Sequence, residues 1–317
     1  MSKLTEAVEA YSLTKWYGRL LAVDHITFTV HTGEIFGFLG PNGAGKTTTV
    51  RMLTGMSRPS GGTAKIMGYD IQAEAVKAKE HIGVVPDTSN VYMELTTWEN
   101  LTFTGKLYGI PRREREERAR SLLKLFDLEE KRSEPAWKLS KGMRRRLCIA
   151  MALMNNSSIL FLDEPTTGLD VQSVIKIREL IRELNKQGLT IFLTTHNMHE
   201  ANVMCDRIAI INKGRIVAVD TPENLKSRAR RLQSVVVSFN RVERQAEAYL
   251  NGIQGALKVV KEGDKYRIYT SSPPDVIQAV CDYAREHKLK IVSISTLKPS
   301  LEDIFLELTA SGGGAYA

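Results

Sequence analysis

Continuous apolar runs alternate with amphipathic stretches along the chain up to about residue 220. The apolar runs are IFGFLG (35–40), ILFLD (159–163), TIFLTT (190–195) and RIAIIN (207–212). Runs of this kind are typical of strands that are buried on both faces of a sheet. Stretches with helical periodicity lie between them, for example 45–55 and 171–187. This alternation predicts an α/β fold with a mostly parallel sheet.

Residues 94–154 depart from the alternation, because their pattern is helical throughout. Within IPRREREERARSLLKLFDL, opposite charges stand four residues apart at Arg112–Glu116, Arg113–Glu117 and Glu114–Arg118. This spacing indicates a solvated helix face that carries ion pairs. We infer a helical subdomain that is inserted into the α/β core.

A new pattern begins after the basic stretch LKSRARR (225–231), which we interpret as a linker, although such a cluster could also contact anionic lipid. In order, the segments that follow are SVVVSF, a helix, LKVV, the turn EGD, YRIYT, a helix from about 274 to 287, and KIVSIST. The resulting β-α-β-β-α-β order is ferredoxin-like. A closing helix is predicted from the capping-box pair Ser300 and Asp303 and from the apolar face Leu301, Ile304, Phe305 and Leu308.

The composition adds limits to this picture. The chain has 317 residues, of which 43% are hydrophobic and 25% charged, so it can bury a well-packed core. It has no apolar run of about 18 residues and no secretory signal, which predicts a cytoplasmic location or a place on the cytoplasmic face of a membrane. Cys148, Cys205 and Cys281 lie far apart, which argues against a zinc site or a disulfide framework. The net charge of +8 fits a phosphate-rich ligand, a nucleic acid or an anionic membrane surface, without choosing among them.

The segment GPNGAGKT (40–47) matches a phosphate-binding loop, and it follows an apolar strand and opens a helix, as that motif requires. Glycines let the backbone approach the phosphates, and the helix N-terminus adds partial positive charge. We expect Lys46 to reach the β- and γ-phosphates and Thr47 to ligate Mg²⁺. The candidate nucleotide-binding residues here are Gly40, Pro41, Asn42, Gly43, Ala44, Gly45, Lys46, Thr47 and Thr48.

Two adjacent carboxylates follow the apolar strand of ILFLDE. They stand at its carboxyl end, where open α/β sheets bind ligands. Asp163 is placed to hold Mg²⁺ through water, and Glu164 is the candidate general base for the attacking water. His196 ends the next strand, TIFLTTH, and could sense or stabilise the γ-phosphate, although a lone histidine there is more often structural.

Taken together, GPNGAGKT, LSKGM, ILFLDEP, TGLD and TTH, in this order and spacing, resemble an ATP-binding cassette (ABC), the ATPase subunit of a transporter. The resemblance covers about residues 6–225. It implies the fold class: a P-loop NTPase α/β cassette with an inserted helical subdomain, followed by the small α+β ferredoxin-like domain. The expected divisions are a cassette over 1–225 with its helical subdomain at about 94–154, a basic linker over 226–231, a ferredoxin-like domain over 232–310 and a flexible tail over 311–317.

The resemblance also implies that two cassettes face each other head to tail. ATP on one phosphate loop is then completed by Ser140 and the Gly142 backbone of the other subunit. Ser140 is in addition a candidate helix N-cap, which would aim the helix dipole at that phosphate. Tyr17 aligns with the aromatic residue that stacks on adenine, and Asp170 with the aspartate that links the two sites across the dimer.

Three positions depart from the family pattern. Asp87 stands where a Gln usually follows VP; an acid there could ligate Mg²⁺, but it changes the charge at the metal. Lys141 replaces the first Gly of the signature, and Met143 replaces its usual Gln. Similar substitutions occur in the drug-resistance exporter branch, which implies an active site, while one degenerate site in a heterodimer stays an alternative.

The predicted function is ATP hydrolysis with Mg²⁺ that closes a dimer and drives a separate permease, peripheral to the membrane. The C-terminal PSLEDIFLELT resembles the exporter branch, and Tyr92, Leu95 and Trp98 are candidates for the permease contact or else for the subdomain core. The alternatives are a soluble cassette ATPase acting on nucleic acid or ribosomes, which we do not expect as partners, a ligand-sensing importer ATPase, and a cassette that binds ATP without turnover. The sequence does not distinguish a homodimer from a heterodimer.

Overall fold

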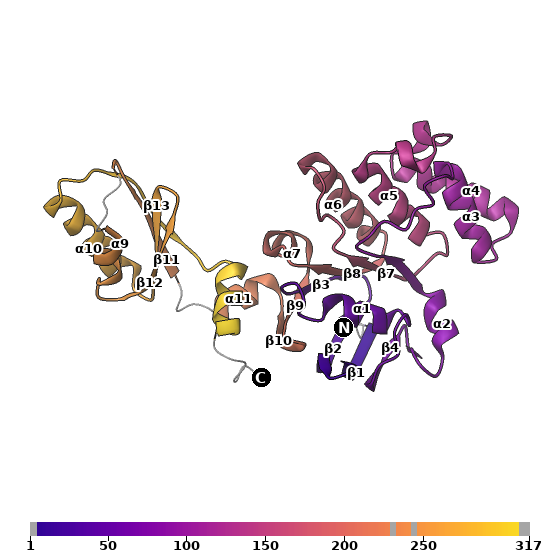
Figure 1. Ribbon diagram of the computed structural model, residues 1–317, viewed down its shortest axis with the longest axis horizontal. Coiled ribbons are helices and arrows are strands. Elements are labelled where there is room, and N and C mark those ends of the chain that lie inside the picture. Colours follow the sequence, from indigo (N-terminus) through magenta and orange to yellow (C-terminus); the bar gives the residue numbers. More distant parts are fainter. Residues whose placement is uncertain (1–4, 229–232, 242–245, 311–317) are drawn as a thin grey trace. The chain divides into compact units, whose positions relative to one another are not determined.

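The structure is a computed structural model that describes residues 5–228, 233–241 and 246–310 (Figure 1). The chain divides into two compact units, with the boundary between Thr221 and Pro222. The tail predicted over 311–317 lies outside the described residues. Each unit is described by itself below.

The first unit is built on a six-stranded sheet. All neighbouring strands in it are parallel except β9 and the edge strand β10, which are antiparallel. In spatial order the strands are β10 (Arg215–Asp220), β9 (Arg207–Asn212), β3 (Ile35–Leu39), β8 (Thr190–Thr195), β7 (Ile159–Asp163) and β6 (Ile82–Val85). Residues of β3, β7 and β8 are buried without exception, as expected for strands that are covered on both faces. The predicted parallel α/β core is confirmed.

A second, antiparallel sheet packs against the first through aromatic side chains. Its strands, in spatial order, are β2 (Leu20–His31), β1 (Glu6–Tyr17), β4 (Gly61–Ile66) and β5 (Tyr69–Asp70). Phe28 of β2 lies 5.8 Å, centroid to centroid, from Phe36 of β3 and 6.1 Å from Phe192 of β8. Burial of these large rings between the two sheets stabilises their packing.

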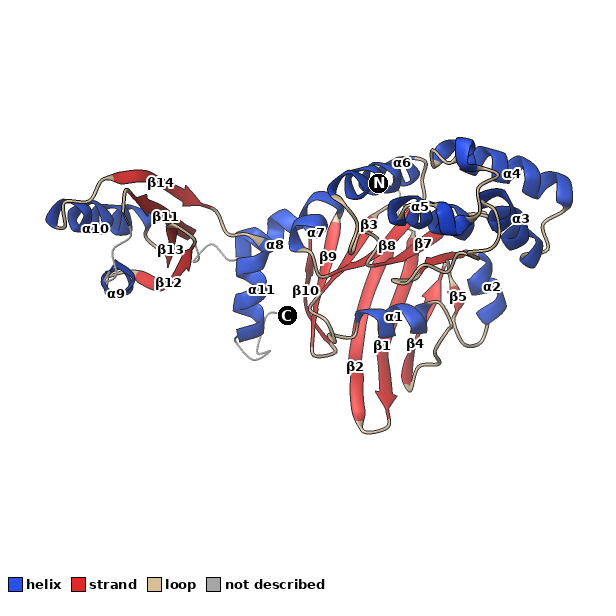
Figure 2. Ribbon diagram, turned by 45° about the horizontal axis from the view of Figure 1, so that its top comes forward, coloured by secondary structure: helices blue, strands red, loops and turns tan. Residues whose placement is uncertain are grey.

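Helices that connect the strands cover the two faces of the central sheet. They are α1 (Lys46–Leu53), α2 (Ala75–Glu80), α6 (Val171–Lys186) and α7 (Met198–Met204). Figure 2 shows α1 on the side of the central sheet that carries β1 and β2, and α6 on the opposite side. The buried face of α6 consists of Ile177, Ile181 and Leu184, spaced by four and three residues as an amphipathic helix requires.

The helical subdomain is interrupted more often than its pattern predicts. It contains α3 (Thr97–Leu107), α4 (Arg112–Leu125), two short 3-10 helices (Glu129–Lys131 and Ala136–Lys138) and α5 (Lys141–Ala152). Gly109, with a φ of +72°, and Pro111 separate α3 from α4, because proline disfavours helical geometry in the residue before it. Residues 94–154 are therefore made of helices, as predicted, but they are not helical throughout. The predicted charge pairs are present: the Arg112 and Glu116 side chains, for example, lie 2.8 Å apart on an exposed face of α4.

The second unit begins with α8 (Pro222–Arg228). Residues 226–228 are therefore helical and not linker, and residues 229–231 lie outside the described part. A helix N-terminus at Pro222 follows the usual preference for proline in the first turn.

The remainder of the second unit has ferredoxin-like topology. Its sheet has the spatial order β12 (Ala256–Glu262), β13 (Lys265–Thr270), β11 (Gln233–Phe239) and β14 (Ile291–Leu297), and every neighbouring pair is antiparallel. The helices are α9 (Ala246–Asn251), α10 (Pro273–Glu286) and α11 (Leu301–Ala310). Tyr283 of α10 is fully buried in the core. At the start of α11, the Asp303 amide donates to Ser300 Oγ at 3.2 Å and the Ser300 amide donates to Asp303 Oδ2 at 2.8 Å, so the predicted capping box is present.

Candidate functional site

The phosphate loop leaves β3 and enters α1, and its first and last glycines are packed too closely to carry a side chain. A Cβ on Gly40 would lie 2.4 Å from the Ile211 carbonyl oxygen. A Cβ on Gly45, which has a φ of +109°, would lie 2.7 Å from the Ala22 carbonyl oxygen. Gly43 has a φ of +79° and nothing within 4 Å above it. The two ends of the loop are therefore fixed against the protein, while its middle, at Gly43, is open to the outside. Such a loop can hold phosphate groups.

A pocket of about 590 Å³ opens over this loop. The lining residues are Tyr17, Leu20, Leu21, Ala22, Asn42, Gly43, Gly45, Lys46, Thr47, Thr48, Asp87, Glu164, Lys213 and Gly214. The fold thus brings the end of β1, the phosphate loop and the turns after β6 and β7 into one cavity. Tyr17 is 44% exposed, and the Lys15 ammonium lies 5.1 Å from the centre of its ring, so the ring can stack on a planar ligand only with its other face. Sequence reasoning missed the segment 20–22 and Lys213, because no motif marks them.

Lys46 is buried, and its ammonium group is hydrogen-bonded to main-chain oxygens of the phosphate loop. Its Nζ donates to the carbonyl oxygens of Gly40 at 2.7 Å and Pro41 at 3.2 Å. It also lies 3.3 Å from Glu164 Oε1. A lysine in this position presents a fixed positive charge to the pocket, as the binding of a phosphate group requires.

Asp163 and Glu164 end β7 in two different environments. Asp163 is buried, and its Oδ1 accepts a hydrogen bond from the hydroxyl of Thr194 on β8. Glu164 has a φ of +48°, a left-handed conformation that costs an L-residue roughly 1–2 kcal/mol. Its Oε1 is buried without a hydrogen bond, next to the pocket that it lines. A strained backbone and a buried oxygen whose neighbour is the Lys46 ammonium distinguish Glu164 from Asp163, and both features fit the predicted role of Glu164 as the base.

His196 lies directly beside Glu164. The distance from His196 Nδ1 to Glu164 Oε2 is 2.9 Å, and the same oxygen accepts a hydrogen bond from Thr167 Oγ1 at 3.1 Å. His196 is 47% exposed and does not line the pocket in this structure. One oxygen of Glu164 is therefore held by two neighbours, and the other points toward Lys46.

A second cluster of predicted residues lies at the N-termini of α5 and α6. Ser140 caps α5, since its Oγ accepts from the Met143 amide at 3.2 Å. Asp170 caps α6, where it accepts from the Ser173 amide at 2.9 Å and from Ser173 Oγ at 2.7 Å. These bonds lower the pKa of Asp170, so the carboxylate is ionised at neutral pH. Each such cap contributes about 1 kcal/mol to helix stability.

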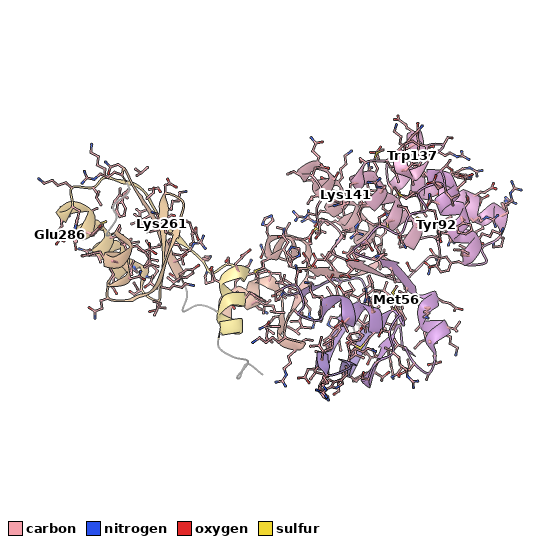
Figure 3. The ribbon with its side chains drawn as sticks, in the orientation of Figure 1. Met56, Tyr92, Trp137, Lys141, Lys261 and Glu286 are labelled. Carbon is pink, nitrogen blue, oxygen red and sulfur yellow. The ribbon has the colours of Figure 1, made fainter. Side chains whose placement is uncertain are left out.

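The two caps are also joined to each other within the chain. Gly142 lies against Ser173, where a Cβ would approach Ser173 Oγ to 2.1 Å. Lys141, which replaces a glycine of the family pattern, donates from Nζ to the Gly168 carbonyl oxygen at 2.9 Å; Figure 3 labels its position at the start of α5. Ser140, Gly142 and Asp170 do not line the pocket over the phosphate loop of their own chain. The two sets of candidate residues therefore form two separate surfaces on one subunit.

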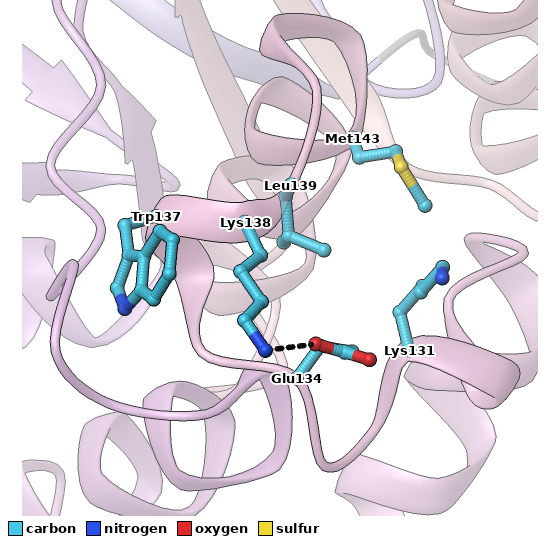
Figure 4. A pocket seen from close by; sticks show the side chains of 6 residues that line it. All are labelled: Lys131, Glu134, Trp137, Lys138, Leu139 and Met143. Atoms are coloured by element: carbon cyan, nitrogen blue, oxygen red, sulfur yellow. Dashed lines mark ion pairs between the residues drawn. The ribbon is translucent and has the colours of Figure 1, made fainter.

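A different pocket, of about 470 Å³, precedes α5 (Figure 4). It is lined by Lys131, Glu134, Trp137, Lys138, Leu139 and Met143. Its only carboxylate, Glu134, is paired with Lys138 at 3.4 Å, as the dashed line in Figure 4 marks. Because its carboxylate is already neutralised by Lys138, we assign no chemistry to this pocket.

The residues at the phosphate loop suit Mg²⁺ bound together with a phosphate. Thr47 and Asp87 line the pocket, and Asp163 lies one residue before Glu164, which also lines it. Among the described residues no group of three His, Cys, Asp or Glu side chains could hold a metal without further ligands. The two carboxylates Asp87 and Asp163, with the Thr47 hydroxyl, fit Mg²⁺, which is usually held by one or two carboxylates and completed by water and phosphate. The Asp87 side chain here accepts from the Thr88 amide at 2.7 Å.

The open glycine-rich loop runs from β3 into the N-terminus of α1, and a carboxylate pair stands at the carboxyl end of β7, two strands away in the same sheet. This arrangement defines a P-loop nucleoside triphosphatase cassette. A family model described as "ABC transporter" matches residues 23–167, and one described as "ATP-binding protein DrrA1-3-like, C-terminal domain" matches residues 221–309. The chain belongs to the ATP-binding proteins of ABC transporters. Both the family and its drug-resistance branch are as the sequence motifs predict.

Relatives resemble the chain over almost its whole length. The linearmycin resistance ATP-binding protein LnrL of Bacillus subtilis is 36% identical, over 95% of this chain and 98% of its own. The daunorubicin/doxorubicin resistance ATP-binding protein DrrA of Streptomyces peucetius is 37% identical, over 96% and 93%. The Nod factor export ATP-binding protein I of Ralstonia nicotianae is 38% identical, over 96% and 94%.

Solved structures resemble the first unit. The cbiO1 protein from Clostridium perfringens, part of an ABC transporter complex, has a TM-score of 0.66 at 27% identity, and the match covers 71% of this chain and 92% of that one. A dimeric ATP-binding cassette bound to ADP and Pi has a TM-score of 0.61 at 28% identity, and the match covers 68% and 98%. The protein is an ATPase subunit of an ABC transporter, as predicted, and the nucleic-acid and importer alternatives are not favoured by these relatives. No helix in the described part of the chain is long and apolar enough to cross a membrane.

Proposed function

We propose that this protein powers an exporter, as a head-to-tail dimer that binds a separate permease on the cytoplasmic face of the membrane. One observation carries the proposal: the subunit has a nucleotide pocket on one surface and the Ser140–Gly142 segment, with Asp170, on another. Two half-sites that do not meet in one chain can meet when a second copy is rotated by a two-fold axis. The names of the relatives, which refer to drug resistance and to export, support the direction of transport.

In the proposed mechanism each residue of the pocket has one role. Lys46 and the loop amides bind the β- and γ-phosphates, and Tyr17 stacks on the adenine. Glu164 orients and deprotonates the attacking water through Oε1, the oxygen that faces Lys46 and the pocket, while His196 and Thr167 hold its other oxygen. Thr47, Asp163 and Asp87 are the residues that would hold Mg²⁺, which supplies neutralisation of phosphate charge when bound.

The permease contact is proposed on the exposed apolar side chains of the helical subdomain. Tyr92, which Figure 3 labels, packs edge-on against Phe103 at 5.1 Å, and both are exposed. Met93 and Leu107 are exposed nearby in sequence. Trp98, predicted for the same surface, is instead half-buried beneath Arg132, whose guanidinium lies 3.8 Å from its ring. Leu95 is also half-buried, so the predicted contact residues reduce to Tyr92.

ATP-dependent dimerisation tests the two-subunit site. The Glu164→Gln variant keeps the pocket and removes the base, so Mg-ATP should convert it from monomer to dimer in size-exclusion chromatography with light scattering. Addition of Ser140→Arg to that variant should keep it monomeric, because a bulky cation replaces the cap at the partner's phosphate. An exposed substitution outside both surfaces, Arg113→Gln, is the control. A Glu164→Gln protein that stays monomeric with ATP would overturn the proposal.

The permease is tested by purification from the membrane fraction of the producing cell. Co-purification of an apolar, polytopic subunit that is lost on replacing Tyr92 and Phe103 by Ser supports transport. Co-purification of RNA or DNA in its place would contradict it.

A further inference from the structure

Arg145 projects from α5 into the interior, five residues after Ser140, and is 6% exposed. All of its hydrogen-bond acceptors in the structure are main-chain carbonyl oxygens. Nε donates to Pro165 at 2.9 Å, Nη2 donates to Asp163 and to Glu164 at 2.8 Å each, and Nη1 donates to Pro86 and, at 3.5 Å, to Asp87. Only a guanidinium has enough fixed N–H groups to make such a set of contacts.

These acceptors belong to two loops that both reach the nucleotide pocket. The first is the turn after β7 that carries Glu164, and the second is the turn after β6 that carries Asp87. Arg145 therefore sets the position of the candidate base relative to the candidate metal ligand. Three successive carbonyls, of residues 163–165, are bound to one side chain, and the middle residue is the strained Glu164. A strained backbone conformation persists only when surrounding contacts hold it, and these three hydrogen bonds hold the backbone at Glu164.

A further bond connects the same helix to the second loop. Cys148, three residues beyond Arg145 on α5, donates from Sγ to Asn90 Oδ1 at 2.6 Å. Helix α5 is thus attached at two points to the segment from Pro86 to Asn90. A displacement of α5 must move this segment and the turn after β7 together, since the packed contacts leave no slack.

We infer that Arg145 is a positioning residue that couples the two half-sites of one subunit. The first turn of α5 carries Ser140 and Gly142, which under the proposed function contact the partner's nucleotide. The second turn carries Arg145, which holds Glu164 and Asp87 in the subunit's own pocket. Engagement of the partner's ATP thereby places the base and the metal ligand at the other site. This inference rests on the proposed function, because it requires Ser140 to face a second subunit.

The neighbouring residue provides a matched control. Arg146 has the same charge, lies on the same helix turn and is 7% exposed. It donates to the Phe126 carbonyl oxygen at 2.7 Å and to Asp127 Oδ2 at 3.0 Å. Its contacts join α5 to the end of α4, inside the helical subdomain, and do not reach the pocket. Any effect that arises only from removing a buried guanidinium from α5 should therefore appear in both positions.

The experiment compares Arg145→Lys and Arg146→Lys in the full chain, in the dimer with its permease. A lysine keeps the charge but cannot bridge two loops. For Arg145→Lys we expect kcat to fall about tenfold or more, the ATP Kd to stay within about twofold, and the Hill coefficient for ATP to fall toward one. For Arg146→Lys we expect a similar fall in Tm but a wild-type Hill coefficient. Equal kcat and Hill values for Arg145→Lys and wild type would overturn the inference.

Two further measurements make the outcome decisive. In the Glu164→Gln background, Arg145→Lys should still dimerise with Mg-ATP; if Glu164→Gln itself does not dimerise, it is the proposed function that fails. If Arg145→Lys does not fold, hydrogen exchange is measured on the Glu164→Gln protein. Amides of residues 87–90, 164 and 166–168 should then gain protection together with ATP and lose it when Ser140→Arg is added. Protection that survives Ser140→Arg would contradict coupling through α5.

Discussion

Gly142, in the first turn of α5, lies directly against Ser173, in the first turn of α6, with no room for a methyl group between them. Ser173 in turn donates to Asp170, which caps α6. The signature segment and the loop before α6 are therefore one packed surface, although 30 residues of chain separate their candidate residues, Ser140 and Asp170. Substitutions at this contact should act on both helices at once.

This contact predicts a rescue between two positions. Gly142→Ala would place a Cβ 2.1 Å from Ser173 Oγ, so α5 and α6 must separate, and we expect ATP hydrolysis to fall about tenfold or more. Ser173→Gly removes the clashing atoms and should restore a large part of the activity in the double variant. A double-mutant cycle of ATPase rates measures this. If the two effects simply add, the contact does not limit activity.

Glu164 and His196 should differ in their effect on turnover. Glu164→Gln removes the candidate base and should lower kcat by about a hundredfold or more, with little change in ATP binding. His196→Ala removes only one of the two neighbours that hold Glu164 Oε2, because Thr167 remains, so its loss should be smaller. Single-turnover hydrolysis and nucleotide binding separate the two quantities. Similar rates for Glu164→Gln and wild type would remove Glu164 from its role.

Asp87 should influence the metal requirement. Asp87→Asn keeps the shape and removes one negative charge from the pocket, so the Mg²⁺ concentration for half-maximal ATPase activity should rise severalfold. Asp163→Asn should abolish metal-dependent activity altogether. Titration of Mg²⁺ at constant free ATP measures both. An unchanged Mg²⁺ requirement in Asp87→Asn would show that Asp87 does not bind the metal.

The three cysteines should differ in their reaction with a thiol reagent. Burial raises the pKa of the Cys148 and Cys205 thiols, so at pH 8 each is ionised to a smaller fraction than a free cysteine. Because the thiolate is the reactive form, only the half-buried Cys281 should be modified in the folded protein. Reaction at the other two should appear only on unfolding in denaturant. Mass spectrometry of the labelled peptides identifies the sites, and rapid labelling of Cys148 in the native protein would contradict the α5–Asn90 contact.

Several parts of this protein could be predicted because they depend on local patterns of residues. Uninterrupted apolar runs predict the buried parallel strands. Successive side chains of a strand point to opposite faces of the sheet, so all of them must be apolar when both faces are covered. The loop GPNGAGKT and the pair Asp163–Glu164 carry their chemistry in short contiguous segments. Ser140 and Asp170 cap their helices as side chains of that type do at any helix start.

The way in which distant segments meet is visible only in the folded protein. In the fold, the Arg132 guanidinium lies over the Trp98 ring, loops separate the helices of the subdomain, and Lys141 Nζ donates to the Gly168 carbonyl oxygen. Arg145 likewise donates hydrogen bonds to five carbonyl oxygens of two loops, which lie 18 to 59 residues away in sequence. Main-chain carbonyls are present at every position and leave no signature in a sequence. A side chain that binds them can therefore be recognised only when the folded backbone shows where those oxygens lie.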